Sequence, residues 1–413
     1  MSAPSVSVIV VSRGRAADLP LCLLGVSQLD FPLFEVVLVA DEAGLEAARG
    51  LPFFDELKTV TFEEANISKA RNLGISEAAG EIVAFIDDDA VPEPTWLRYL
   101  TAGFSEPEVA VAGGFVRGRN GISFQWKARS VDCFGDATPL DVSEDKISIL
   151  TPTNGRAIKT EGTNMAVRRD VIAQMGGFDP AYRFYLDETD LNYRMMQEGH
   201  RTAIAPLAQV HHGYKASATR RQDRVPTDLT EIGASLAVYL RKFAPNTQHK
   251  VTFAKARKEQ RVRALRHMMA GLLEPRDVRR LMGSFDKGVE VGSQRAISTL
   301  STIPLARDGF KPLTQRFKGQ HVIVEGSWFK RKALRQMAME TVRNGTRTSL
   351  FIFSPTLRPH KVRFTKEGVW EQTGGLFGRS VRAGAHVLGV TQKKRVAQEL
   401  KRLAKLRDFP PKV

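Results

Sequence analysis

Short apolar runs alternate with amphipathic, helix-like stretches along the first 100 residues of the chain. The apolar runs have the length of buried strands and lie at Ser5–Val11, Phe34–Ala40, Leu57–Phe62 and Ile82–Ile86. Helical patterns fill the gaps at Ala16–Gln28 and Ser68–Ala79. Such alternation predicts an α/β fold, with a mostly parallel sheet covered by helices on both faces. Ligands of such sheets bind beyond the carboxyl ends of the strands, so the residues that follow each strand are the first to inspect.

The pattern becomes less regular after residue 100 and changes character twice. Residues 116–160 show no clear periodicity, whereas a helix is predicted from about Glu188 to Glu198, before Gly199. Residues 216–318 predict a basic, mainly helical segment, with helices at Leu229–Phe243 and Phe253–Leu273. We therefore expect three parts, which cover residues 1–215, 216–318 and 319–413.

Residues 319–413 resume an α/β pattern and predict a small C-terminal domain. Its expected elements are strands, a hairpin and a helix, at His321–Glu325, Lys330–Arg343, Ser349–Phe353, Val362–Thr373 and His386–Val390. A Lys-rich helix follows the last of these. Nothing in the sequence tells whether this part docks an acceptor, recognises a partner protein or stabilises the fold.

Charge divides the chain into two unlike parts. Residues 1–215 carry 20 basic and 30 acidic side chains, a net charge of −10, whereas residues 216–413 carry 41 and 15, a net charge of +26. This asymmetry suggests different partners for the two parts. The basic part is either a solvated helical surface or a surface that docks on an anionic membrane. Nucleic acid is a weaker interpretation, because the segment contains no aromatic–basic RNA-binding motif.

The number of cysteines and the length of the apolar runs predict where in the cell the protein is located. Cys22 and Cys133 are too few for a disulfide framework, which favours two reduced thiols in a cytosolic protein. The N-terminal apolar run is too short to span a membrane and lacks a basic segment before it, as a signal peptide would have. We therefore expect a cytoplasmic protein, compatible with a peripheral position on the inner face of the cell membrane.

Three aspartates, Asp87, Asp88 and Asp89, directly follow the fourth predicted strand. Carboxylates gathered at the end of a buried strand repel one another, and burial adds to the cost of keeping them charged. A bound Mg²⁺ or Mn²⁺ removes that cost and also attracts diphosphate oxygens. Because side chains alternate along a strand, Asp89 is the candidate metal ligand, Asp87 contacts metal or ribose, and Asp88 faces the sugar. A solvated acidic turn is the alternative.

A second acidic group and a histidine pair lie further along the chain. Asp187, Glu188 and Asp190 begin a predicted helix, where the helix dipole alone favours negative charge. A carboxylate there that points into a cleft could also accept a proton from an attacking hydroxyl. The pair His211-His212 follows an apolar stretch, and neutral imidazole is a good third ligand for a metal such as Mn²⁺.

Together, these motifs give residues 5–215 a resemblance to the family 2 glycosyltransferases, which have the GT-A fold. The resemblance is carried by six motifs in the order of the family: SVIVVSRGR, VVLVAD, ANISKARNLGISEAAGEIVAFIDDDAVPEPTWL, GTNMAVRRDVIAQMGGFD, YLDETDLNYRMMQEGHR and the histidine pair. It covers about half of the chain and leaves the C-terminal part without a match.

The resemblance implies roles for particular residues of this sequence. Donor-binding positions fall on Ser12, Arg13, Asp41, Arg71, Asp87, Asp88, Gly162, Thr163 and Asn164. Metal-binding positions fall on Asp87, Asp89 and either His211 or His212. The Glu-Asp pair of the family, whose Asp is the base, appears here as Asp187-Glu188. Glu188 is therefore the expected base, and Asp187 stays open as an alternative.

The resemblance also implies an activity. The family inverts the anomeric carbon in one displacement, with a nucleoside-diphosphate sugar as donor, a divalent metal (Mn²⁺ or Mg²⁺) as cofactor and a saccharide or lipid-linked saccharide as acceptor. Polysaccharide or glycolipid synthesis is the expected setting. Two other functions compete with this one: a nucleotidyltransferase on a similar sheet, and a catalytically silent scaffold whose basic half binds anionic partners.

Overall fold

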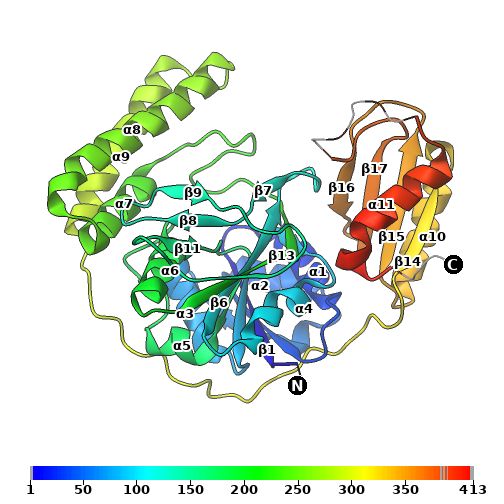
Figure 1. Ribbon diagram of the computed structural model, residues 1–413, viewed down its shortest axis with the longest axis horizontal. Helices are drawn as coiled ribbons and strands as arrows, with labels where there is room; N and C mark the ends of the chain where they lie inside the picture. The colour runs from blue at the N-terminus through cyan, green and yellow to red at the C-terminus, as the bar shows by residue number, and fades with distance from the viewer. Residues whose placement is uncertain (1–2, 382–383, 385–386, 388, 410–413) are drawn as a thin grey trace.

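The computed structural model describes residues 3–381, 384, 387 and 389–409. Figure 1 shows a central α/β domain with a helical hairpin standing off one side and a small sheet domain docked on the other. This mixed, mostly parallel α/β core of the GT-A type, followed by a helical segment and a small C-terminal sheet, confirms the predicted fold class. Within the described ranges, we find no helix long and apolar enough to cross a lipid bilayer.

The main sheet positions the site. Its strands run in the order β10-β13-β6-β12-β4-β1-β2-β3, with β5 paired to β13 and β7 paired to β6. Their bounds are Val6–Ser12 (β1), Phe34–Ala40 (β2), Lys58–Thr61 (β3), Ile82–Asp87 (β4), Ala90–Pro92 (β5), Val109–Arg117 (β6), Phe124–Trp126 (β7), Ser148–Leu150 (β10), Met165–Arg168 (β12) and Arg201–His212 (β13). Strands β4, β1, β2 and β3 are parallel, and β12 is antiparallel to both its neighbours. Ser12 pairs with Ala40 and Val11 with Asp87, so the ends of these strands share one edge.

Helices cover both faces of this sheet because its strands are apolar on both sides. Val8 and Val10 of β1 pack in one buried cluster with α1 and α4, while Ile9 packs in the other with α3, α5 and α6. The helices are Leu19–Ser27 (α1), Glu42–Arg49 (α2), Ile67–Glu77 (α3), Trp96–Thr101 (α4), Arg169–Gln174 (α5) and Asp187–Gln197 (α6). A second, three-stranded sheet consists of Ala157–Lys159 (β11), Arg129–Val131 (β8) and Ala137–Pro139 (β9). It lies in the stretch 116–160, where the sequence showed no clear pattern.

The basic segment contains one helix more than the sequence predicted. Helices α7 (Thr230–Phe243) and α8 (Asn246–Met269) correspond to the two expected ones, and α9 (Pro275–Gln294) is additional. Glycines lower the helix propensity of α9, but they also let its backbone approach α7 closely. An added Cβ at Gly288 would meet the carbonyl oxygen of Thr230 at 2.1 Å, and one at Gly292 would meet that of Ala234 at 2.2 Å.

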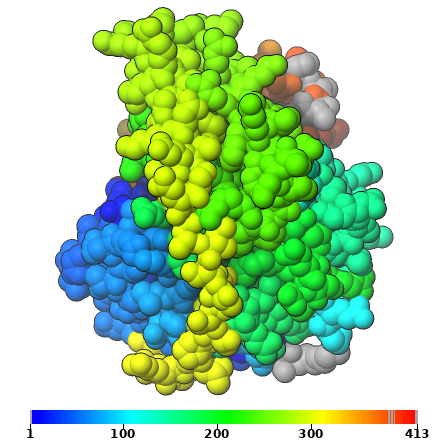
Figure 2. Space-filling model, turned by 90° about the vertical axis from the view of Figure 1, so that its left-hand side faces the viewer, coloured from blue at the N-terminus to red at the C-terminus, as the bar shows by residue number. Residues whose placement is uncertain are grey.

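An extended strap, residues 295–318, connects the helices to the C-terminal domain. Figure 2 shows it running down from α8 and α9 across the central α/β domain. Backbone hydrogen bonds anchor it, from Ile303 N to Ala173 O (3.0 Å) and from Leu313 N to Phe34 O (2.9 Å). The strap therefore ties both later parts of the chain to the main sheet.

The C-terminal domain contains a sheet in the order β14-β15-β17-β16, in which only the β16–β17 pairing is antiparallel among the described pairings. Its elements are Val322–Ser327 (β14), Arg331–Arg343 (α10), Thr348–Ser354 (β15), Lys361–Phe364 (β16), Val369–Gly375 (β17) and Gln392–Arg407 (α11). The predicted strand His386–Val390 extends outside the described residues.

Candidate active site

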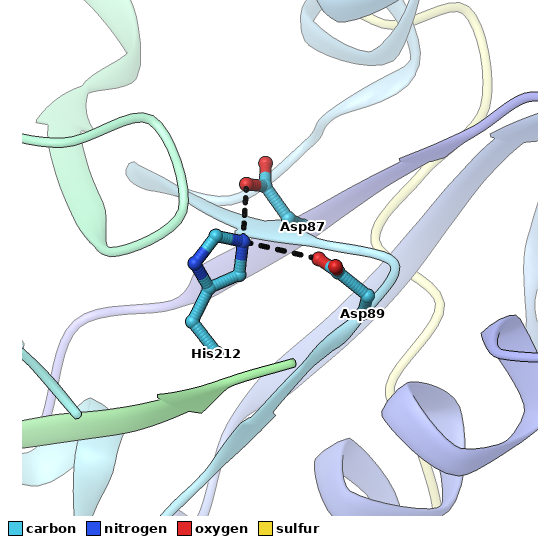
Figure 3. Close-up of side chains that lie close together, drawn as sticks. All are labelled: Asp87, Asp89 and His212. Carbon is cyan, nitrogen blue, oxygen red and sulfur yellow. Dashed lines mark ion pairs between the residues drawn. The ribbon is translucent and has the colours of Figure 1, made fainter. Parts of the chain in front are cut away.

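Asp87, Asp89 and His212 converge at the edge where β4 and β13 end. One ligand atom of each lies within 4.8 Å of the other two. We call these three residues the metal-type cluster. The Nε2 atom of His212 is 3.2 Å from Asp89 Oδ1 and 3.8 Å from Asp87 Oδ2, as Figure 3 shows. The end of β4, with the two residues that follow it, and the end of β13 thus bring these three side chains together.

The donor atoms of this cluster fit a divalent metal. Asp89 Oδ1 is buried and has no hydrogen-bond partner in the described part of the chain. The Nδ1–H group of His212 donates to Gln125 Oε1 of β7 at 3.1 Å, and its Nε2 atom faces the two carboxylates. Burial alone would raise the pKa of Asp89, but His212 and the charge of Arg15 lower it below its ordinary value. Carboxylate oxygens beside an imidazole nitrogen are a suitable ligand set for Mn²⁺.

The neighbouring histidine faces elsewhere. The Nε2–H group of His211 donates to Glu93 Oε1 at 2.8 Å, and its ring lies 4.8 Å from that of Trp370 in the C-terminal domain. Successive side chains of a strand point to opposite sides, so only one of the two histidines can face the aspartates. The sequence left the choice between them open, and the geometry brings His212 to the cluster.

Asp88, the middle aspartate, is held by the loop that follows β1. It accepts hydrogen bonds from Ser12 Oγ (2.8 Å) and Arg15 Nη1 (2.8 Å). Burial raises the pKa of Asp88 to about 7; the charge of Arg15 opposes this shift and the charge of Asp89 adds to it. Arg15 also lies 3.4 Å from Asp89, which places it in the site although the sequence analysis did not single it out. Its place in the SRGR stretch, four residues beyond the predicted strand end at Val11, was the available signal.

A cavity of about 560 Å³ opens beside Arg15 and is lined by residues that include Gly14, Asp18, Lys215 and Gln222. Lys215 also contacts the acidic cluster, since its backbone N–H donates to Asp89 Oδ2 at 2.7 Å. The cavity therefore adjoins the aspartates at the carboxyl end of β1, the edge of the sheet where ligands of such folds bind.

Asp41 and Arg13 belong to the same edge. The carboxylate of Asp41 caps α2 by accepting from Gly44 N (2.9 Å), and it also accepts from Gly14 N (2.7 Å) of the β1–α1 loop. Arg13 is exposed and donates from Nε to the Glu63 carbonyl at 2.8 Å. Asp41 thus fixes the shape of the loop, and Arg13 lies at its rim.

Arg71 of α3 joins the two acidic groups. Its guanidinium forms an ion pair with Asp187 through Nη1, and its Nη2 lies 3.4 Å from Asp87 Oδ1. The beginning of α6 therefore stands beside the aspartate cluster. Gly162 allows this arrangement, because an added Cβ there would meet Arg71 Nη2 at 2.4 Å.

The next two residues after Gly162 differ in their surroundings. Thr163 Oγ1 is buried and has no hydrogen-bond partner among the residues that the structure describes. The side-chain amide of Asn164 is buried and hydrogen-bonded within the protein. It accepts from Trp96 Nε1 (2.7 Å) and donates to the backbone carbonyls of Phe115 and Ala208. Asn164 therefore holds strands together at the base of the site.

Asp187 and Glu188 have opposite electrostatic surroundings. Burial, with a contribution from Glu188, raises the pKa of Asp187, although Arg71 opposes the shift. Glu188 is half-buried, and Lys159 Nζ, which lies 2.8 Å from its Oε1, lowers its pKa. The side chain of Glu188 is 18% exposed against 4% for Asp187, so Glu188 is the more accessible of the two.

The backbone before this pair is strained. Tyr185 and Leu186 have φ values of 73° and 64°, which non-glycine residues adopt rarely. Two such residues in succession, directly before two carboxylates, match the tendency of backbone strain to concentrate at functional sites.

An α/β domain with a possible metal site and a separate carboxylate pair at one sheet edge is typical of enzymes that bind their ligands beyond the carboxyl ends of the strands. Comparison with known families makes this specific: the family described as "Glycosyltransferase like family 2" matches residues 3–228, more than half of the chain. The protein belongs to this family, and its C-terminal region lies outside the match.

Curated relatives agree with this family. The O-antigen biosynthesis protein RfbC of Myxococcus xanthus is 27% identical over 246 residues, which cover 54% of this chain and 18% of that protein. The glucosyl-dolichyl phosphate glucuronosyltransferase of Haloferax volcanii is 29% identical over 150 residues, 35% of this chain and 46% of that protein. The matches therefore span less than half the length of either relative.

Solved structures resemble the chain more distantly. The mannosyltransferase PcManGT of Pyrobaculum calidifontis, in complex with GDP-Man and Mn²⁺, has a TM-score of 0.41 and 18% identity, covering 71% of this chain and 72% of that one. GalNAc-T7 with UDP, GalNAc and Mn²⁺ has a TM-score of 0.44 and 18% identity, covering 58% and 48%.

Proposed function

We propose that the protein is an inverting glycosyltransferase that uses Mn²⁺ or Mg²⁺ to move a sugar from a nucleoside-diphosphate donor to an acceptor hydroxyl. The observation that carries this proposal is the position of Arg71, which contacts both Asp87 and Asp187. Through it, the aspartate–histidine cluster and the carboxylate pair of α6 share one site. A single displacement requires both: a site for the leaving diphosphate and a base for the acceptor hydroxyl.

The donor would bind across the carboxyl ends of β1, β2 and β4. Ser12, Arg13 and Asp41 shape or border the loop that would contact the nucleotide, and Arg15 adds a cation close to the diphosphate position. A bound Mn²⁺ or Mg²⁺ would neutralise the diphosphate and improve it as a leaving group. Asp87, Asp89 and His212 are the residues that would hold the ion.

Glu188 would be the general base. It is the more accessible carboxylate of its pair, and Lys159 keeps it ionised at neutral pH. Asp187 would instead hold Arg71 in place as a structural partner of the donor site. Because positioned bases are most effective when they point at the proton they accept, the partly exposed Glu188 is better suited to meet an acceptor.

Replacing Lys159 with Met should shift the pH dependence of transfer. The positive charge of Lys159 favours the carboxylate form of Glu188, so its removal should raise the pKa of Glu188. The rate falls as pH drops through that pKa, because a protonated base cannot accept a proton. A pH profile of kcat/KM should therefore show the acidic limb of the variant at higher pH than that of the wild type. An unchanged limb would mean that Glu188 is not the titrating base.

The names of the relatives support an acceptor in polysaccharide or glycolipid synthesis. The relative from H. volcanii is a glucuronosyltransferase for glucosyl-dolichyl phosphate, and the relative from M. xanthus belongs to O-antigen biosynthesis. We accordingly propose a saccharide or lipid-linked saccharide as the acceptor class.

A panel of nucleotide sugars tests the function. Metal-dependent release of nucleoside diphosphate from one donor, stimulated by a saccharide acceptor, is the expected result. Release of pyrophosphate from a nucleoside triphosphate would instead support a nucleotidyltransferase. Binding of anionic partners without turnover of any donor would support a silent scaffold.

The tip of the α8–α9 hairpin is the part of the basic segment best suited to meet an anionic membrane. Met269 is 84% exposed and Leu272 is 38% exposed, and exposed arginines flank them at Arg266 and Arg276. Each Lys or Arg residue near anionic lipid contributes about 1 kcal/mol to the free energy of membrane binding. Arg221, from the loop that also bears Lys215, donates to the Leu272 carbonyl at 3.2 Å, so the tip lies on the side of the donor cavity.

Acidic substitutions at this tip should therefore weaken binding to anionic vesicles. We expect the double variant Arg266→Glu, Met269→Glu to bind phosphatidylglycerol vesicles about tenfold more weakly in a sedimentation assay. Leu305→Glu is the matched control, because Leu305 is 79% exposed but lies on the strap. Equal vesicle binding by the tip variant and the wild type would remove the membrane role of the tip.

A further inference from the structure

The short segment that follows Asp89 is paired with the end of the strand that bears His212. Strand β5 pairs with the end of β13, with Ala90 opposite His212. Two further backbone hydrogen bonds close the ends of this ladder, from Gly213 N to Asp89 O (2.7 Å) and from Glu93 N to Gln209 O (2.9 Å). The position of the aspartate relative to the histidine therefore depends on this short antiparallel pairing.

A buried ion pair with the C-terminal domain holds the far end of the ladder. Glu93 receives two hydrogen bonds from Arg407 at the end of α11, from Nε (2.8 Å) and from Nη2 (2.9 Å), and both side chains are completely buried. His211 donates to the same carboxylate at 2.8 Å. One carboxylate thus connects β5, β13 and a helix that lies 314 residues further along the chain.

Apolar contacts surround this ion pair. The ring of Trp370 in β17 lies 4.4 Å from the guanidinium carbon of Arg407 and 4.8 Å from the ring of His211. Val91 of β5 packs in the same buried cluster as Trp370 and Phe364. The C-terminal sheet is therefore built against the back of the strand pair whose front carries the metal-type cluster, on the side of the catalytic domain seen at the right of Figure 1.

We propose that the C-terminal domain is a structural part of the metal centre, in which Arg407, Glu93 and His211 act as positioning residues for Asp89 and His212. The inference rests on the proposed metal-dependent function. It gives a role to a domain that lies outside the family match.

Complete burial of the Glu93–Arg407 ion pair explains why its loss would disturb the metal-type cluster. A buried carboxylate that loses its partner must move toward water, become protonated or find another donor. If the Glu93 side chain moves, it no longer holds His211 and the end of β5, and the register between Asp89 and His212 then loosens. Partners that hydrogen-bond to metal ligands typically change metal affinity by about 10–100-fold when they are replaced. Arg407 acts one step further back, through Glu93, so the lower end of that range is expected for its variants.

A matched pair of arginine variants in the full-length protein separates positioning from general stability. Arg407→Met removes the partner of Glu93. Arg347→Met removes a second buried arginine of the same interface, which donates to the carbonyls of Gln28 (2.7 Å) and Leu29 (3.1 Å) and does not contact β5 or β13 in any described hydrogen bond. Mn²⁺ affinity is measured by calorimetric titration, and the thermal midpoint is measured alongside.

Both variants should have lower thermal midpoints, but only Arg407→Met should lose Mn²⁺ affinity, by about tenfold or more. Arg407→Lys keeps the charge without the paired N–H donors, and it should show a smaller loss of Mn²⁺ affinity. The test therefore does not depend on whether Arg407→Met folds. If both Arg407 variants bind Mn²⁺ as tightly as the wild type, or if Arg347→Met loses as much affinity, the inference is wrong. Failure of the wild type to bind Mn²⁺ would instead contradict the proposed function itself.

Discussion

Replacing Glu188 with Gln is expected to lower kcat for sugar transfer by about 10²–10⁴-fold, the usual contribution of a positioned general base. Gln keeps the size of the side chain but cannot accept a proton from the acceptor hydroxyl. Donor affinity should stay within a few-fold of the wild-type value, because Glu188 contacts Lys159 rather than the aspartate cluster. Steady-state transfer kinetics and a calorimetric donor titration measure the two quantities separately.

Asp187→Asn is the informative companion variant. It removes the carboxylate that pairs with Arg71, and Arg71 also contacts Asp87, so donor binding and turnover should both suffer. Should Glu188→Gln retain more than a tenth of wild-type turnover while Asp187→Asn loses only kcat, the base would be Asp187.

The second large effect is expected at the metal-type cluster. Asp89→Ala should abolish measurable Mn²⁺ binding and lower transfer by more than about a hundredfold, since a catalytic metal supplies several kcal/mol of charge stabilisation. Asp89 offers a buried oxygen without a hydrogen-bond partner among the described residues, next to His212. Calorimetry with Mn²⁺, followed by donor titration with and without a chelator, measures both consequences.

An exposed aspartate provides the control for this variant. Asp170→Ala lies in the first turn of α5, away from the cluster, and should leave Mn²⁺ affinity unchanged. Wild-type Mn²⁺ affinity in Asp89→Ala would remove Asp89 from the metal site, whatever happens to turnover.

The strands that frame the site were predictable because burial on both faces leaves a plain apolar run. Phe34–Ala40 is buried at every position, and the predicted range agrees with β2 residue for residue. The strands between residues 116 and 160 were not predicted, because β7, β8, β9, β10 and β11 are only three residues long and show no alternation of buried and exposed positions. Segments this short contain too few alternations to reveal a period.

Position along a strand could be predicted, but pairing between strands could not. The sequence placed the aspartates at a strand end, where the structure has them. It could not choose between His211 and His212, since that choice depends on the register of β5 against β13. The ion pair of Glu93 with Arg407 was equally hidden, because its partners are far apart in sequence and each alone looks like an ordinary surface charge.

In the proposed reaction, Asp87, Asp89 and His212 bind a divalent ion against the diphosphate of the donor. A crystal structure of the full-length protein soaked with Mn²⁺ and a nucleoside diphosphate, with anomalous scattering recorded at the manganese edge, tests it most directly. We predict one strong anomalous peak bonded to the carboxylate of Asp89, to Nε2 of His212 and to oxygens of the diphosphate. A bound nucleotide with no manganese peak among these side chains, or with the peak at another set of residues, would contradict the account.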